Sequence, residues 1–79
     1  MPETANEATM AALTREGSVR SIRIEESGNG KYGVVAVTKM GERTLVGQRG
    51  DVRQFASLDT IAKYLRNKIG IIEFKVTGK

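Results

Sequence analysis

The sequence predicts a small α+β domain: an antiparallel sheet in βββαβ order, with one helix packed on one face and a disordered N-terminal tail. Three observations predict this class. Short β-rich runs separated by turn residues fill positions 18–47, an amphipathic helical pattern occupies 57–69, and an alternating apolar run closes the chain at 71–76. At 79 residues, the chain is large enough for one compact core only.

Residues 1–17 are predicted to be a disordered tail, and residues 18–79 a single folded domain. The tail is rich in Ala, Thr, Glu and Asn, and its only sizeable apolar side chains after the first residue are Met10 and Leu13. So few apolar groups cannot offset the entropy lost on ordering, and an isolated helix of this length is marginal in water. Gly17 marks the predicted boundary.

Three strands are predicted to follow the tail. The first, 19–24, alternates apolar and polar residues, and the Ser-Gly-Asn-Gly stretch after it is typical of a hairpin turn. The second, 32–38, is apolar on both faces, which indicates a central strand covered on two sides or an interface strand. A turn at 40–42 leads to the third strand, 43–47, and completes an antiparallel meander.

A loop over 47–55 is predicted to connect the meander to the helix. Ser57 is the expected N-cap, and Gly70 is the expected left-handed residue that ends the helix. The residues expected to face the core are Leu58, Ile61, Ala62, Leu65 and Ile69. The residues expected on the exposed side are Lys63, Tyr64, Arg66 and Asn67.

The residue inventory disfavours catalysis. The chain has no His and no Cys, which removes the commonest general base, the commonest zinc ligands and the most nucleophilic side chain. Glu25 and Glu26 point to opposite faces of a strand, so they are poorly placed to share a proton or a metal. The Gly-Asn-Gly-Lys stretch at 28–31 lacks the spacing and the following helix of a phosphate loop. We therefore expect no enzymatic activity, no catalytic or metal-binding residues and no cofactor.

The composition also indicates where the protein is located and whether it needs to self-associate. No run approaches the ~20 apolar residues of a membrane span, and no basic, apolar segment of signal-peptide type follows Met1. The sequence therefore predicts a cytoplasmic protein that does not enter a membrane. Without disulfides or Cys/His metal ligands, the small core must be held by apolar packing alone or by self-association, so a homodimer is an open alternative.

The charge of the chain is unevenly distributed. Residues 1–29 hold three arginines against five glutamates, whereas residues 30–79 hold ten basic residues against four acidic ones. This skew fits a body that faces a polyanion, although chance segregation on a soluble surface would produce it too. The pattern favours nonspecific DNA contact, because a dedicated single-strand binder would carry more aromatic residues. The candidate nucleic-acid-binding residues are Lys39, Arg43, Arg49, Arg53, Lys63, Tyr64 and Arg66.

Three segments, at 20–25, 30–37 and 45–59, resemble small accessory proteins of plasmids and integrated mobile elements. The group in question is described as partition-associated, and the likeness extends roughly over residues 20–76. The resemblance implies a bacterial, cytoplasmic, non-enzymatic role in maintaining or transferring a DNA element, with a partition or conjugation protein as partner. It supplies no binding residues.

Two functions stay open at this point. The first is a DNA-associated accessory module that uses the basic residues. The second is a protein–protein interaction adaptor that uses the 32–38 strand or an open sheet edge, without contact to nucleic acid. Salt separates the two, because phosphate contacts release counterions and weaken steeply with salt, whereas apolar or edge-strand pairing hardly responds.

Overall fold

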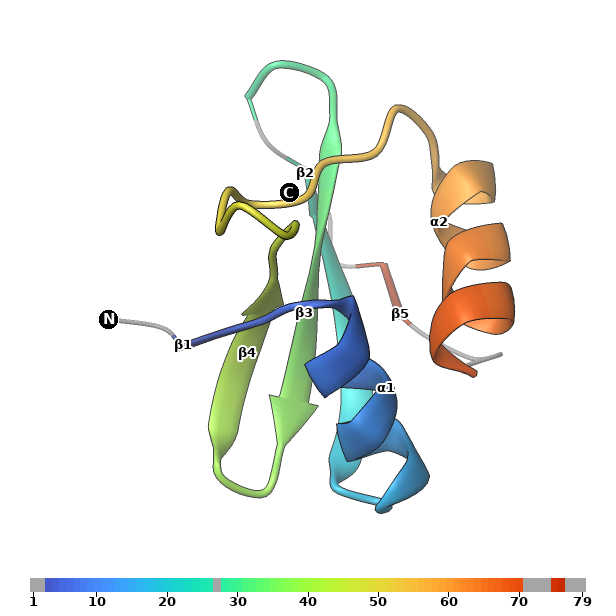
Figure 1. The fold of residues 1–79 in the computed structure, drawn as a ribbon. Coiled ribbons are helices and arrows are strands. Elements are labelled where there is room, and N and C mark those ends of the chain that lie inside the picture. Colours follow the sequence, from blue (N-terminus) through green and yellow to red (C-terminus); the bar gives the residue numbers. More distant parts are fainter. Residues whose placement is uncertain (1–2, 27, 71–74, 77–79) are drawn as a thin grey trace.

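The structure is a computed structural model of the chain, and it describes residues 3–26, 28–70 and 75–76. Figure 1 shows an α+β arrangement, which confirms the predicted class. The elements in order are β1 (Glu3–Ala5), α1 (Glu7–Arg15), β2 (Val19–Glu26), β3 (Tyr32–Thr38), β4 (Gly41–Leu45), α2 (Leu58–Tyr64), the π-helical η1 (Leu65–Ile69) and β5 (Lys75–Val76).

The strands form one sheet in the order β1-β4-β3-β2-β5. Its centre, β2 to β4, is the predicted antiparallel meander, in which Ile24 pairs with Val34 and Val35 pairs with Thr44. The two edge strands are parallel to their neighbours, β1 to β4 and β5 to β2, so the sheet is mixed instead of purely antiparallel. Residues 71–74 of the predicted closing strand lie outside the described residues.

The N-terminal segment corrects the prediction of a disordered tail. Residues 3–15 form β1 and α1, and Asn6 caps the helix by accepting a 2.9 Å hydrogen bond from the Thr9 amide. Met10 has no exposed surface, and Ala5 belongs to the same buried cluster. The prediction considered the segment by itself, whereas in the fold the rest of the chain supplies the apolar surroundings that Met10 enters. Two helices therefore cover the sheet instead of one.

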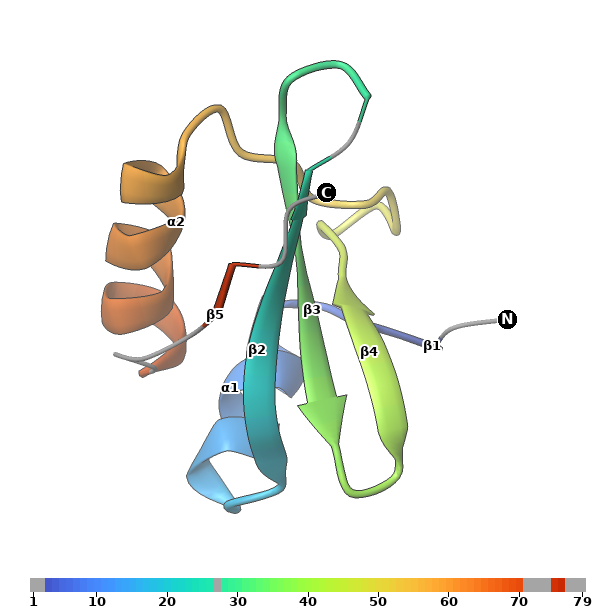
Figure 2. The ribbon, with the colours of Figure 1, turned by 180° about the vertical axis from the view of Figure 1, so that it is seen from behind.

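Both helices lie on the same face of the sheet, as Figures 1 and 2 show from opposite sides. The core fills the space between these two layers. The predicted apolar stripe of the helix is confirmed at Ile61, Leu65 and Ile69, which are all buried, while Leu58 is partly buried. The largest fully buried side chains are Met10, Ile22, Ile24, Val34, Leu45, Ile61 and Leu65.

The predicted ends of the second helix are confirmed. The Ser57 hydroxyl accepts a 3.2 Å hydrogen bond from the Thr60 amide, which satisfies one of the unpaired donors of the first turn. Gly70 follows the last turn with a φ of 96°. Its amide donates to the Leu65 carbonyl, five residues earlier, which is the wider spacing of a π-helix.

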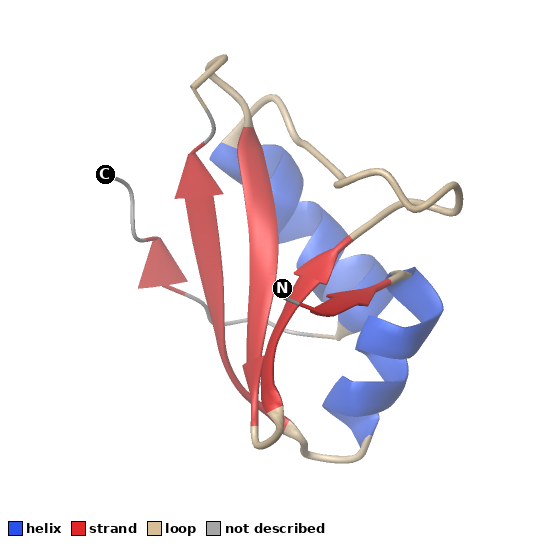
Figure 3. Cartoon of the chain, turned by 90° about the vertical axis from the view of Figure 1, so that its left-hand side faces the viewer, coloured by secondary structure: helices blue, strands red, loops and turns tan. Residues whose placement is uncertain are grey.

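The opposite face of the sheet carries no helix among the described residues (Figure 3). On this face the Arg23 side chain extends from β2 to β4. Its Nε donates to Glu25 at 2.8 Å, and its two terminal nitrogens donate to Glu42 on β4 at 2.6 and 2.8 Å. The hydrogen bond from Arg23 holds the pKa of the Glu42 carboxyl below its usual value. Because β3 lies between β2 and β4, this ion pair spans the central strand, where Val35 is only 5% exposed.

Candidate nucleic-acid interface

Tyr64 does not lie on the exposed side of the helix, and the prediction that placed it there is wrong. Tyr64 is 9% exposed, its ring centroid is 5.1 Å from that of Phe55, and its hydroxyl donates to the Glu7 carboxylate at 3.1 Å. Its partner Glu7 belongs to α1, the helix that the sequence did not predict to be part of the fold. Tyr64 is therefore a core residue and not a stacking surface for bases.

The environment of Tyr64 gives a measurable signature. Burial, and after it the hydrogen bond to Glu7, raise the pKa of Tyr64 to about 12. The unfolded chain loses this proton at about pH 10, so the stability linked to Tyr64 is full below pH 10 and is lost as the pH rises toward 12. We expect absorbance titration to show a phenol that ionises near pH 12 and that is missing from Tyr64→Phe. An identical titration curve for the variant would contradict the assignment.

Arg53 is held against this aromatic pair. Its guanidinium carbon lies 5.3 Å from the Phe55 ring centroid and 4.9 Å from that of Tyr64, within the range of cation–π contacts. Arg53 also lines a pocket of about 270 Å³ together with Asn6 and Glu7. The negative charge of the Glu7 carboxylate would repel a phosphate in that pocket. The contacts of Arg53 with the two rings instead hold the loop after β4 against the second helix.

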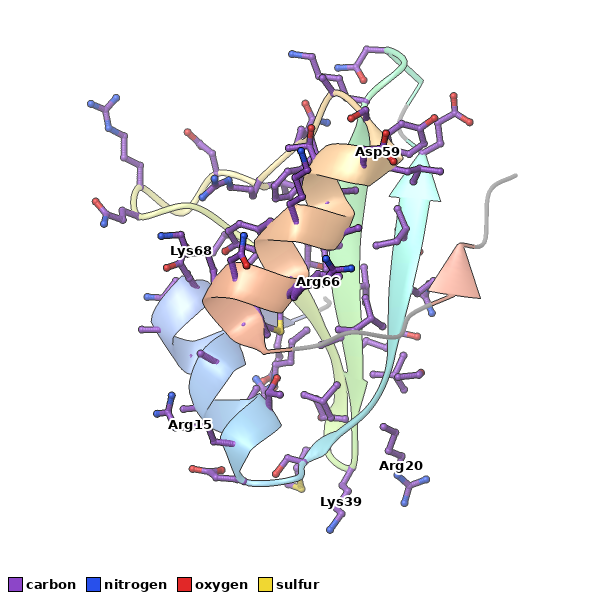
Figure 4. The ribbon with its side chains drawn as sticks, turned by 90° about the vertical axis from the view of Figure 1, so that its right-hand side faces the viewer. Arg15, Arg20, Lys39, Asp59, Arg66 and Lys68 are labelled. Carbon is purple, nitrogen blue, oxygen red and sulfur yellow. The ribbon has the colours of Figure 1, made fainter. Side chains whose placement is uncertain are left out.

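The remaining predicted residues do not all converge on one face. Arg43 forms an ion pair with Glu3 between β4 and β1, which neutralises its charge. Arg49 belongs to the yellow loop in Figure 1, which projects on the side of the sheet away from α2. Lys39 lies at the opposite end of the molecule, in the β3–β4 turn (Figure 4). Lys63 and Arg66 are exposed on the second helix, as the sequence predicts.

Figure 4 shows a different set of cations on the helix side of the molecule. We call this set the basic helix side, and all of its members are exposed. Within the described part of the chain, none of them takes part in an ion pair. The five residues are Arg15 on α1, Arg66 and Lys68 on η1, and Arg20 and Lys39 at the lower end of the sheet.

Sequence reasoning missed Arg15, Arg20 and Lys68 as members of this set. Arg15 and Arg20 belong to the part of the chain with a negative charge balance, so a count of charge along the sequence does not select them as binding residues. The position of a cation within a helix could have identified two of them. Arg15 and Lys68 lie in the last turns of α1 and η1, where the helix dipole favours cations.

Most of the exposed carboxylates lie away from the five cations. Glu3, Glu25 and Glu42 are engaged by Arg43 and Arg23 on the sheet. Asp59 lies at the far end of α2 from the basic residues (Figure 4). Glu7, in the first turn of α1, accepts a hydrogen bond from Tyr64, and Glu16, next to Arg15 in sequence, is exposed at the end of α1. The charges of the outer sheet face are therefore largely paired, whereas those of the helix side are available to a ligand.

Other kinds of site find no support in the described residues. Residues 3–26, 28–70 and 75–76 contain no group of three or more side chains that could hold a metal ion. None of the helices in this part of the chain is long and apolar enough to cross a membrane. Comparisons with protein-family models, with curated proteins and with solved structures find no match to this chain.

Proposed function

We propose that the protein is a non-enzymatic accessory module that associates with DNA through the basic helix side. The observation that supports this proposal is the set of five exposed cations without ion-pair partners on one side of the described molecule. Cations fixed on helices and strand ends attract phosphates and displace the counterions that surround the duplex.

The arrangement favours contact with the DNA backbone over base reading. The five residues of the basic helix side are long, charged side chains with no aromatic ring among them, and the described residues span 32 × 27 × 23 Å, similar to one duplex turn of about 34 Å. Phosphate contacts of this kind position a protein on DNA without sequence preference. The resemblance to partition-associated proteins supports DNA as the polyanion and a bacterial plasmid or integrated element as the setting.

A titration of labelled duplex DNA at several salt concentrations tests the proposal. We expect dissociation constants of about 10⁻⁴–10⁻⁶ M near physiological salt and tighter binding at low salt. Replacing Arg66 and Lys68 with Gln removes two phosphate contacts and should flatten the plot of log affinity against log salt by about 1.8.

The matched control is Lys31→Gln combined with Arg49→Gln, which removes the same charge from the β2–β3 hairpin and the loop. This pair should leave the salt dependence unchanged, because neither residue lies on the basic helix side. If wild type fails to bind at low salt, or if the two double variants lose binding equally, the proposed interface is refuted.

A protein-interaction adaptor is the second candidate function. It is favoured by the outer face of the sheet, where the described residues place no helix (Figure 3). A small groove lined by Val35, Thr44 and Val52 opens on this face. Binding to this face would depend little on salt, which separates it from DNA binding.

A further inference from the structure

The turn between β2 and β3 contains the one Asn-Gly pair of the sequence, Asn29 and Gly30. Both residues are exposed, as is Gly28 before them, and the turn projects at the top of Figure 1. Gly30 has a φ of 80°, which glycine adopts without strain. Apart from its chain neighbours, a Cβ built on Gly28 or Gly30 would have no heavy atom within 4 Å. The turn therefore has open space in which its backbone can rearrange.

A hydrogen bond orients the Asn29 side chain within this turn. The Lys31 amide donates to Asn29 Oδ1 at 3.2 Å, so the side chain folds back along its own backbone. This conformation brings Asn29 Cγ toward the amide nitrogen of Gly30, which carries no side chain to shield it. The hydrogen bond also polarises the side-chain carbonyl, because its oxygen is the atom on which negative charge develops when a nucleophile adds to Cγ.

We propose that Asn29 is a site of spontaneous deamidation in the folded protein. The Gly30 nitrogen, after losing its proton to a base in solution, bonds to Asn29 Cγ and closes a five-membered succinimide. The Cγ–Nδ2 bond breaks, and the leaving group takes a proton from water to become ammonia. A second water then opens the imide: cleavage at Cγ leaves an aspartyl residue, and cleavage at the main-chain carbonyl leaves an isoaspartyl residue. No oxidant or reductant takes part.

The other two asparagines of the chain are poorly placed for the same reaction. Asn6 is the N-cap of α1 and is followed by Glu7, whereas Asn67 lies within η1 and is followed by Lys68. In both pairs the second residue carries a side chain beside the attacking nitrogen, and helical structure restricts the backbone rearrangement that ring closure needs. Asn29 should therefore react alone, which makes Asn6 and Asn67 internal controls.

The reaction alters both the charge and the backbone of the hairpin. A neutral amide becomes a carboxylate, so the formal net charge falls by one from +4. In the isoaspartyl form the main chain runs through the former side chain, which adds one backbone atom between the paired residues Glu26 and Tyr32. The modified fraction increases with the age of the molecule, and cation-exchange chromatography can separate it from unmodified protein.

Mass spectrometry of the purified chain, incubated for days at body temperature and mildly alkaline pH, tests the proposal. We expect the mass to increase by about 1 Da, within the peptide that contains Asn29 and in no peptide that contains another asparagine. The rate should rise with pH, because the attacking nitrogen must first lose its proton. Methylation by an isoaspartate-specific methyltransferase distinguishes the isoaspartyl product from the aspartyl one.

Two variants remove one reacting partner each. Asn29→Gln is the matched control: it keeps the amide and the charge, but ring closure would need a six-membered ring, so the mass should stay constant. Gly30→Ala places a Cβ beside the attacking nitrogen and should slow the reaction by about tenfold. Alanine is strained at the φ of Gly30, so circular dichroism is used to check that this variant is folded.

The unfolded chain in guanidinium chloride measures what the folded turn contributes, since it has the same sequence without the Lys31 hydrogen bond. The folded protein should react faster than this reference or within about threefold of it. Stronger protection by the fold, a mass increase that persists in Asn29→Gln, or equal reaction at Asn6 or Asn67 would each overturn the proposal. The readout is covalent, so these results do not depend on DNA binding.

Discussion

Met10→Ala is expected to lower the free energy of unfolding by about 2–5 kcal/mol, because it empties a fully buried site between α1 and the rest of the core. A chain of this length has a total stability of roughly 4–12 kcal/mol, so the loss is a large fraction of it. Urea melts followed by circular dichroism measure the change.

Met40→Ala is the matched control for this experiment. The chemical change is the same, but Met40 is 85% exposed, so its truncation should alter the free energy of unfolding by less than about 0.5 kcal/mol. Equally small effects at both positions would mean that α1 does not pack on the core and that the N-terminal segment is the tail that composition suggests.

Leu65→Ala should have an effect of similar size, about 2–5 kcal/mol. Leu65 has no exposed surface and lies where α2 passes into η1, four residues from Ile61 and four from Ile69. These three side chains form the stripe by which the second helix contacts the core, so a cavity at the centre of the stripe loosens all of it.

Lys63→Ala serves as the control on the same helix, since Lys63 is exposed and alanine is a good helix former. Its effect in the same urea melts should stay within about 0.5 kcal/mol. A loss at Lys63 as large as that at Leu65 would show that the helix packs through a different face.

The parts of the fold that the sequence predicted are those governed by short-range rules. Ser57 caps the helix through a neighbouring amide, and Gly70 ends it through its own backbone conformation. The ends of the second helix can therefore be predicted from a few neighbouring residues. The alternation of β2 and the turn residues around β3 likewise predicted the antiparallel meander without knowledge of its neighbours.

The candidate interface was only partly predictable, since Lys39 and Arg66 were expected to contribute and Arg15, Arg20 and Lys68 were not. Charge can be counted along a sequence, but its grouping depends on which elements become neighbours. Arg15 joins Arg66 and Lys68 only because α1 and η1 cover the same face of the sheet (Figures 1 and 4).

The amino-acid sequence by itself determined the α+β class, the central meander and the bounded second helix, because local backbone preference and apolar periodicity specify each of them. Only the tertiary structure decided that residues 3–15 join the core, that Tyr64 turns inward to Glu7, and that β1 and β5 extend the sheet in parallel. The physical reason is that a weakly apolar segment such as α1 gains its stability from surfaces that distant parts of the chain provide.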